Sequence, residues 1–143
     1  MWVITSVGAG TLAGFDFSSI EILEGGEEKD TINYSSWTTK VDVDLDAGTA
    51  SDDTADGEFV VIGFEDVIGS SGGDTLTGDE ADNTLTGGEG GDTLHGGLGD
   101  DVYQFADNWG FDTVSESIWK RGLPRCSPAS RIFRTLSEPP SMM

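Results

Sequence analysis

Positive charge is scarce in most of this 143-residue chain. Residues 1–117 contain only Lys29 and Lys40 against 26 acidic side chains, a net charge of −24, whereas residues 118–143 contain five basic side chains against Glu138. We therefore expect no nucleic-acid partner, since phosphate binding draws on lysine and arginine. A chain this acidic repels itself when compact, so it either stays expanded or needs bound cations.

Cysteine and histidine each occur once, as Cys126 and His95. A single cysteine excludes an internal disulfide and a cysteine-rich zinc site. A single histidine excludes a zinc site of the H-E-x-x-H type. We expect His95 to be a surface residue. Because no catalytic constellation is present, we expect that this chain is not an enzyme by itself.

Long apolar runs are also missing. Hydrophobic residues make up 36% of the chain, which is low for a fold held by its side-chain core alone. No stretch approaches the roughly 20 apolar residues of a membrane span. The first eight residues lack the basic and apolar regions of a signal peptide. We therefore expect a soluble chain without a membrane span, and any export would use another route.

Glycine is abundant, and much of it falls in four consecutive nine-residue units that begin at Gly69, Gly78, Gly87 and Gly96. The last two units fit the pattern G-G-x-G-x-D-x-U-x, in which U is apolar. In every unit an Asp or Asn at position six precedes the apolar or aromatic residue at position eight. The pairs are Asp74 with Leu76, Asn83 with Leu85, Asp92 with Leu94, and Asp101 with Tyr103.

This spacing predicts a calcium-binding turn. Positions six and eight lie on the same side of an extended segment, so the apolar residues stack inward while the carboxylates point into the gap between turns. Glycines at positions one, two and four permit tight turns with positive φ and expose carbonyl oxygens. Carboxylate and carbonyl oxygens are the ligands that Ca²⁺ selects. The predicted metal-site residues are Asp74, Asn83, Asp92 and Asp101, together with Gly72, Gly88, Gly90, Gly97 and Gly99.

Two nonapeptides form one coil, so loops on the same side of the coil recur at every second unit. Loop 69–74 is therefore expected to face loop 87–92, and loop 78–83 to face loop 96–101. We predict one Ca²⁺ between the loops of each pair.

The two predicted sites differ in strength. The first uses Asp74 and Asp92. The second is weaker, because Asn83 supplies a neutral oxygen opposite Asp101 and Ala81 replaces a turn glycine. Two further acidic side chains of that loop are candidates to compensate, namely Asp79 and Asp82.

A longer internal repeat includes part of the first half of the chain. Residues 20–32 and 64–76 superpose at an offset of 44, each with an apolar residue followed by Glu, a glycine turn and a final Asp-Thr-apolar run. Each copy predicts a strand, a turn and a second strand, and we expect a degenerate coil from about residue 10. Asp30 shares the Asp-Thr-apolar context but has Glu28 in place of a glycine, so a cation there is not favoured.

The run from Val41 to Asp46 alternates apolar and acidic residues, which predicts a half-buried strand. Its three Asp residues imitate the start of an EF-hand loop. Gly48, however, falls one position late for that motif, and no helical pattern flanks the run, so a solvated strand face is favoured.

Three other segments carry simpler expectations. Residues 46–58 are small and acidic without periodicity, which predicts a surface loop. Residues 59–64 are apolar and predict a strand. Aromatic residues after the repeats, Trp109 and Phe111 among them, are expected to plug the end of the stack.

The nonapeptides and the run from Phe64 to Gly78 resemble the hemolysin-type calcium-binding (RTX) family, clearly over residues 60–114 and weakly over 10–45. The resemblance implies an all-β fold, a parallel β-roll or right-handed β-solenoid with Gly/Asp-rich turns. It also implies bound Ca²⁺, a secreted bacterial protein, and a type I secretion apparatus as partner of the parent protein. We divide the chain into a degenerate solenoid region (1–58), the calcium-binding roll (59–117) and an atypical basic tail (118–143), which we expect to be disordered.

The function expected from this resemblance is calcium binding that drives the folding of a secreted module. Two alternatives concern the parent protein. It could be a secreted enzyme, such as a serralysin-type metalloprotease or an alginate epimerase, with this chain as its C-terminal module. It could instead be a repeat-rich adhesin. The basic tail does not resemble the C-terminus expected of a type I secretion signal.

The unequal sites give a first prediction. Replacing Asp92 with Ala should weaken calcium binding more than replacing Asn83 with Ala, because Asp92 contributes a charged ligand and Asn83 a neutral one. Isothermal titration of both variants with calcium measures the difference. Equal or reversed losses of affinity would show that the loops are paired wrongly.

Overall fold

The computed structural model describes residues 1–6, 9–12, 15–17, 22–52, 59–105 and 110–115. The expectations for residues 118–143 and for Trp109 lie outside these residues. The described part consists of short strands without a helix, which confirms the all-β class. The strands are β1 (Trp2–Ser6), β2 (Ala9–Leu12), β3 (Phe15–Phe17), β4 (Ile22–Glu24), β5 (Thr31–Asn33), β6 (Val41–Asp44), β7 (Thr49–Asp52), β8 (Phe59–Ile62), β9 (Asp66–Ile68), β10 (Thr75–Thr77), β11 (Thr84–Thr86), β12 (Thr93–His95), β13 (Val102–Gln104) and β14 (Thr113–Ser115).

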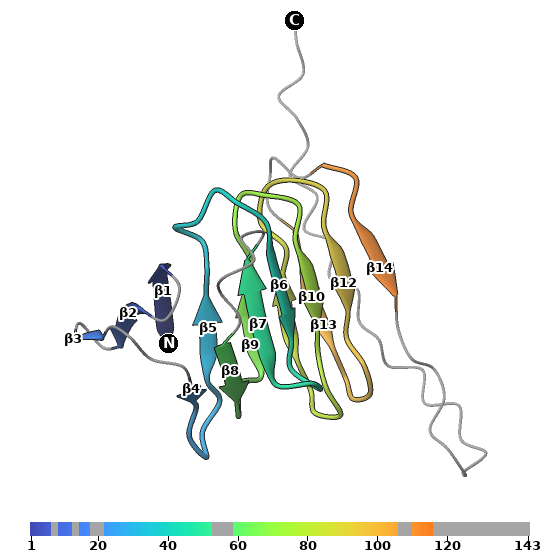
Figure 1. The fold of residues 1–143 in the computed structure, drawn as a ribbon. Coiled ribbons are helices and arrows are strands. Elements are labelled where there is room, and N and C mark those ends of the chain that lie inside the picture. The colour runs from blue at the N-terminus through green and yellow to red at the C-terminus, as the bar shows by residue number, and fades with distance from the viewer. Residues whose placement is uncertain (7–8, 13–14, 18–21, 53–58, 106–109, 116–143) are drawn as a thin grey trace, which may run out of the picture.

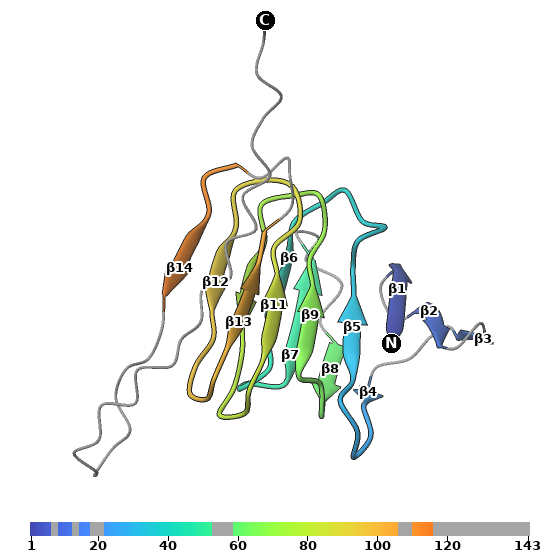
Figure 2. The same ribbon diagram turned by 180° about the vertical axis from the view of Figure 1, so that it is seen from behind.

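Two sheets face each other along the roll (Figures 1 and 2). The first sheet has the order β13-β11-β9-β5-β1-β2-β3, and the second has the order β14-β12-β10-β6-β7-β8-β4. From β9 to β14 the chain alternates between the sheets, and each strand pairs in parallel with the next strand of its own sheet. The predicted parallel β-roll is therefore confirmed.

The coil length follows from the strand register. Thr75 lies opposite Thr93, and Thr84 lies opposite Val102, so each coil comprises two nonapeptide units. The last step is longer, because Thr93 lies opposite Thr113. A step of two units places position eight of one unit directly beside position eight of the next unit in the same sheet.

The interior of the repeats contains one large side chain per strand. Leu76, Leu85, Leu94 and Tyr103 are each 0% exposed, whereas their neighbours on either side point outward. Side chains alternate between the two faces of a strand, so a three-residue strand directs only its central residue inward. In the repeats this central residue is the one at position eight. The packing between the two sheets depends on these residues.

The N-terminal strands join the same sheets. β5 pairs in parallel with β9, and β6 with β10, so both sheets continue across the expected boundary at residue 58. The offset-44 copies are strand–turn–strand units as predicted, since β4 and β5 flank loop 25–30 as β9 and β10 flank loop 69–74. The expected coil from about residue 10 is wrong, because β1, β2 and β3 form an antiparallel meander.

The alternating segment is a strand with Val41 and Val43 buried and Asp42 exposed, as predicted. The predicted surface loop 46–58 is wrong in part, because Thr49–Asp52 forms β7. A tight turn allows this pairing: the amide of Ala47 donates to the Asp44 side chain (2.8 Å), and the chain returns antiparallel to β6. Small side chains favour such a hairpin only in the presence of a partner strand, which local periodicity does not reveal.

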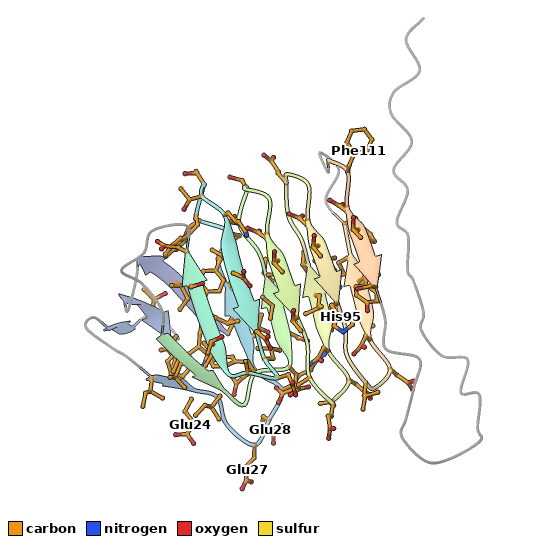
Figure 3. All side chains as sticks on the ribbon, turned by 45° about the vertical axis from the view of Figure 1, so that its right-hand side comes forward. Glu24, Glu27, Glu28, His95 and Phe111 are labelled. Carbon is orange, nitrogen blue, oxygen red and sulfur yellow. The ribbon has the colours of Figure 1, made fainter. Side chains whose placement is uncertain are left out.

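The predicted aromatic plug is half right. Tyr103 is buried and Phe105 packs partly against the core, but Phe111 is 98% exposed. Figure 3 shows Phe111 projecting from the end of the roll, away from the core. Its neighbour Asp112 points inward instead, and a strand-like segment cannot direct both side chains the same way.

In the part of the chain that the structure describes, no helix has the length and apolarity needed to cross a membrane.

The single-residue layers give a second prediction. Leu85→Ala should destabilise the calcium-loaded protein by about 2–5 kcal/mol, since the cavity has no neighbouring apolar side chain on the same strand to fill it. Ile62→Ala is the control, because Ile62 is 49% exposed and its loss should cost less than about 0.5 kcal/mol. Chemical denaturation of both variants measures this, and equal costs would contradict the layered core.

Candidate metal centre

The connections of the roll form two rows of loops, one at each end of the strands (Figure 1). Connections from the first sheet to the second make up the upper row: loops 34–40, 69–74 and 87–92, with residues 110–112 beyond them. Connections from the second sheet to the first make up the lower row: loops 25–30, 63–65, 78–83 and 96–101. The predicted facing pairs, 69–74 with 87–92 and 78–83 with 96–101, are therefore neighbours.

A chain of hydrogen bonds, which we call the carboxylate ladder, connects the upper loops. The Asp92 carboxylate accepts the amide of Asp74 (2.9 Å), and the Asp112 carboxylate accepts the amide of Asp92 (2.9 Å). Asp74 in turn accepts the amide of Val41 (2.8 Å). Each side chain at position six thus binds the backbone of the preceding coil, which fixes the distance between successive loops.

The lower row repeats this arrangement. The Asp101 carboxylate accepts the amide of Asn83 (3.0 Å), and the side-chain amide of Asn83 donates to the carbonyl of Glu65 (3.2 Å). The Glu65 carboxylate accepts the amide of Asp30 (2.8 Å). The structure therefore brings together Asp74 with Asp92, and Asn83 with Asp101, as the spacing of two units predicts.

The four position-six side chains of the repeats are all buried, with Asp74, Asn83 and Asp92 1% exposed and Asp101 4% exposed. Charged carboxylates seldom remain in such places without compensation. Burial raises the pKa of Asp74 above its ordinary value, and amide and hydroxyl donors partly oppose this. Burial raises the pKa of Asp92 to about 6, and the neighbouring Asp74 and Asp112 carboxylates add to the increase.

Glycines serve two purposes in these loops. Gly88, Gly90, Gly97 and Gly99 have φ of +109°, +108°, +94° and +117°, as predicted for positions two and four. The prediction of positive φ is wrong for Gly72 and for the glycines at position one. At position one, glycine is needed because a side chain would not fit. A Cβ at position one would collide with the carboxylate of its own unit, as Gly87 illustrates with Asp92.

In the first two units, the residue at position two donates hydrogen bonds to the side chain at position six of its own loop. The amide of Ser70 donates to Asp74 Oδ2 (2.6 Å), and the Ser70 hydroxyl donates to Asp74 Oδ1 (2.8 Å). The amide of Asp79 likewise donates to Asn83 (2.9 Å). In the third unit, position two is Gly88 with positive φ, and Asp92 Oδ2 has no hydrogen-bond partner among the described residues.

Backbone carbonyl oxygens of loop 69–74 lie against the loop that contains Asp92. The carbonyl oxygens of Ser70 and Gly72 lie where side chains of residues 88 and 90 would begin, so glycine at both positions keeps the oxygens accessible to the gap between the loops. No group of three or more His, Cys, Asp and Glu side chains converges on a metal position within the described ranges. A cation here would therefore depend on backbone carbonyls in addition to carboxylates, a set of hard oxygen ligands that fits Ca²⁺.

The lower pair has the same construction. The carbonyl oxygens of Asp79 and Ala81 lie against Gly97 and Gly99, in the loop that contains Asp101. The Asp79 side chain accepts the amide of Ala81 within its own loop (2.8 Å). The Asp82 carboxylate accepts the amide of Asp100 from the facing loop (2.7 Å). Compensation by Asp79 and Asp82 at the weaker calcium site stays a prediction.

Sequence reasoning missed two ladder members. Asp112 extends the upper ladder, and its buried Oδ2 has no hydrogen-bond partner among the described residues. Glu65 occupies position six in the lower row. The Asp-Thr-Val context of Asp112 is a signal that could have identified it, whereas nothing local distinguishes Glu65. His95, as expected, lies on the outer face (Figure 3), with Nδ1 2.9 Å from the Ser115 hydroxyl oxygen.

The raised pKa of Asp92 generates a third prediction. In chelator, the fraction of protein with folded repeats should increase as the pH falls from about 7 to about 5, because the folded-state pKa near 6 exceeds the ordinary value and protonation favours the folded state. Calcium affinity should fall over the same range, since the ligand must be deprotonated. Circular dichroism in chelator and calcium titrations measure the two trends.

Asp92→Asn should reduce the pH dependence of the circular dichroism signal in chelator, whereas Glu89→Gln, which removes an exposed acid of the same loop, should not. An unchanged pH dependence in Asp92→Asn would contradict the assignment.

Comparison with known proteins agrees with this geometry. Residues 68–103 match the family model of the RTX calcium-binding nonapeptide repeat in four copies. No curated protein and no solved structure matches the chain. The matched region includes both predicted loop pairs, while Glu65 and Asp112 lie outside it. The loops and strands of residues 68–103 are thus four RTX calcium-binding nonapeptide repeats.

Proposed function

We propose that the chain binds Ca²⁺ between stacked loops of the roll and that this binding drives the folding of the repeats. The observation that supports the proposal most strongly is the buried Oδ2 of Asp92, which has no hydrogen-bond partner among the described residues. It belongs to a loop whose Gly88 and Gly90 lie against the carbonyl oxygens of Ser70 and Gly72. A buried carboxylate oxygen without a donor is costly, and a cation removes that cost.

The residues that would hold calcium are assigned by their place in the ladder. In the upper row, Asp92 and Asp74 face the gap between loops 69–74 and 87–92. In the lower row, Asp101 and Asn83 face the equivalent gap. Bound Ca²⁺ would supply positive charge and link carbonyl and carboxylate oxygens of two coils. The chain itself supplies the register, because the ladder amides hold the loops at a fixed separation.

Charge makes this binding a folding switch. Residues 69–115 contain ten acidic side chains and no Lys or Arg, so closing the coils without cations concentrates negative charge. Ligand that binds the folded state alone adds its binding free energy to folding. Sites of about 10⁻⁴–10⁻³ M suffice for this purpose in extracellular modules.

We further propose that the parent protein is secreted. The repeats would remain unfolded at the low calcium concentration inside the cell and would fold outside it. RTX repeats are typical of extracellular bacterial proteins, and a type I secretion apparatus is the corresponding export partner. In this proposal the chain is a binding module and not an enzyme, whether its parent is a secreted enzyme or an adhesin.

Calcium titration tests the proposal. The far-ultraviolet circular dichroism signal of β structure should increase on addition of calcium to chelator-treated protein. Magnesium at the same concentration should not replace calcium, because it requires a tighter octahedral shell and keeps its waters.

Asp92→Asn should shift the calcium midpoint to higher concentration by about tenfold or more, since each 1.4 kcal/mol of lost binding is a factor of ten. Glu89→Gln is the matched control, as Glu89 is an exposed acid of the same loop. A β signal that is complete in chelator and unchanged by calcium would rule the proposal out.

A further inference from the structure

We propose that the N-terminal part of the roll folds without calcium and forms the platform on which calcium closes the repeats. We define the platform as strands β1 and β4–β9 with the described loops between them, and the repeat stack as residues 69–115. The inference rests on the proposed function and adds that the calcium dependence of folding varies along the roll. Folding depends little on calcium at the N-terminal end of the roll and strongly at the C-terminal end.

The apolar core is concentrated in the platform. Of the fourteen buried apolar side chains among the described residues, ten precede residue 69 and four belong to the repeat stack. The ten are Ile4, Leu23, Ile32, Tyr34, Val41, Val43, Ala50, Val61, Phe64 and Val67. Apolar burial stabilises by about 25 cal/mol per Å², so the platform gains most of the stabilisation that needs no ion. The repeat stack, with one buried side chain per strand, gains little.

Aromatic contacts consolidate the platform at both ends. The rings of Trp2 and Phe64 meet edge to face with centroids 5.9 Å apart, and those of Tyr34 and Trp37 do so at 5.7 Å. Trp37 Nε1 also donates to the carbonyl of Ile4 (2.8 Å), which ties an upper loop to β1. Such contacts add about 0.5–1.5 kcal/mol each beyond area burial.

Loop 25–30 of the platform resembles a nonapeptide loop, and hydrogen bonds within the protein hold it without a metal. Asp30 Oδ2 accepts the amide of Gly26 (2.6 Å), as Asp74 Oδ2 accepts that of Ser70. The loop opposite it, 63–65, is short, and its Glu65 carboxylate accepts the amide of Asp30. The backbones meet directly, since the amides of Glu65 and Asp66 both donate to the Asp30 carbonyl (3.2 and 3.1 Å).

Both lysines of residues 1–117, Lys29 and Lys40, lie in the platform. Lys29 Nζ is 2.7 Å from Asp66 Oδ1 and donates to the hydroxyl of Thr84 (3.0 Å). Lys40 lies near Asp74 and opposes the increase in its pKa. The Lys29–Asp66 ion pair is half exposed and contributes modestly to stability. It nevertheless gives the platform a positive side chain, whereas the repeat stack contains no Lys or Arg. Glu27 and Glu28 of the same loop point away from the roll (Figure 3).

The boundary between platform and repeat stack is a parallel sheet edge. β6 pairs with β10, and β9 pairs with β11, so the platform presents a formed strand edge to each sheet of the stack. Asp74 at this boundary has donors on both oxygens. Three buried carboxylate oxygens of the described residues have no hydrogen-bond partner, namely Asp66 Oδ1, Asp92 Oδ2 and Asp112 Oδ2. The one in the platform, Asp66 Oδ1, has Lys29 Nζ 2.7 Å away, whereas no salt bridge within the described residues is found for the two in the repeat stack. Because non-local parallel pairing is slow to nucleate, a preformed edge would allow the repeats to add in order from β10 to β14.

Hydrogen exchange of the full chain, in chelator and in saturating calcium, tests the inference. The platform reporters are the amides of Gly25 and Tyr34, which donate to Ile62 and Ile68. The stack reporters are the amides of Thr93, Val102 and Thr113, which donate to carbonyls one coil away. At calcium about 100 times the dissociation constant, stack amides should gain about 100-fold protection. Platform amides should be protected in both conditions and change by less than about tenfold.

Glu65→Ala should accelerate exchange of the platform amides in chelator, because it removes the acceptor for Asp30. Glu89→Ala, an exposed acid in the repeat stack, should leave them unchanged. Should Glu65→Ala fail to fold, the comparison of wild-type protein in the two conditions still decides the question.

Platform amides that exchange freely in chelator, while calcium protects both parts together, would overturn the inference and leave calcium-driven folding intact. Stack amides already protected in chelator would overturn calcium-driven folding itself.

Discussion

A buried carboxylate that accepts a hydrogen bond from the preceding coil is the interaction on which this roll depends. It fixes the register at two nonapeptides per coil, brings glycine-rich loops into contact, and places a negative charge where water does not reach it. The amide bond offsets part of the cost of removing that charge from water. The rest must come from other donors or from a cation.

The two ends of the roll differ in how they meet this requirement. At Asp74 the donors are Ser70 and Val41, and at Glu65 the donor is the amide of Asp30. At Asp92 the loop contains Gly88 with positive φ, and the Oδ2 atom of the carboxylate has no hydrogen-bond donor among the described residues. Closing this loop without a cation is therefore less favourable than closing the loop at Asp74, and calcium offsets that difference in the proposed folding mechanism.

Much of this arrangement could be predicted from the sequence because it is periodic. The nine-residue phase determines which side chains point inward, and two units per coil determine that Asp74 meets Asp92 and Asn83 meets Asp101. Features set by partners distant in sequence could not be predicted in the same way. Ala50 and its neighbours form a strand only because β6 lies beside them, and Glu65 acts as a ladder member only because loop 25–30 faces it. The positive φ expected at Gly72 is absent, and its amide there donates to the hydroxyl of Ser70 (2.9 Å), a side chain that the glycine at position two of the perfect units lacks.

A crystal structure of the protein grown in calcium, with data collected to locate anomalous scattering from the ion, would show whether calcium lies between the stacked loops. We expect a calcium ion between loops 69–74 and 87–92, with Asp92 Oδ2 among its ligands and the bond from the Asp74 amide to Asp92 Oδ1 retained. Calcium absent from this gap, or an Asp92 carboxylate that remains without a cation while the loops stay stacked, would contradict this expectation.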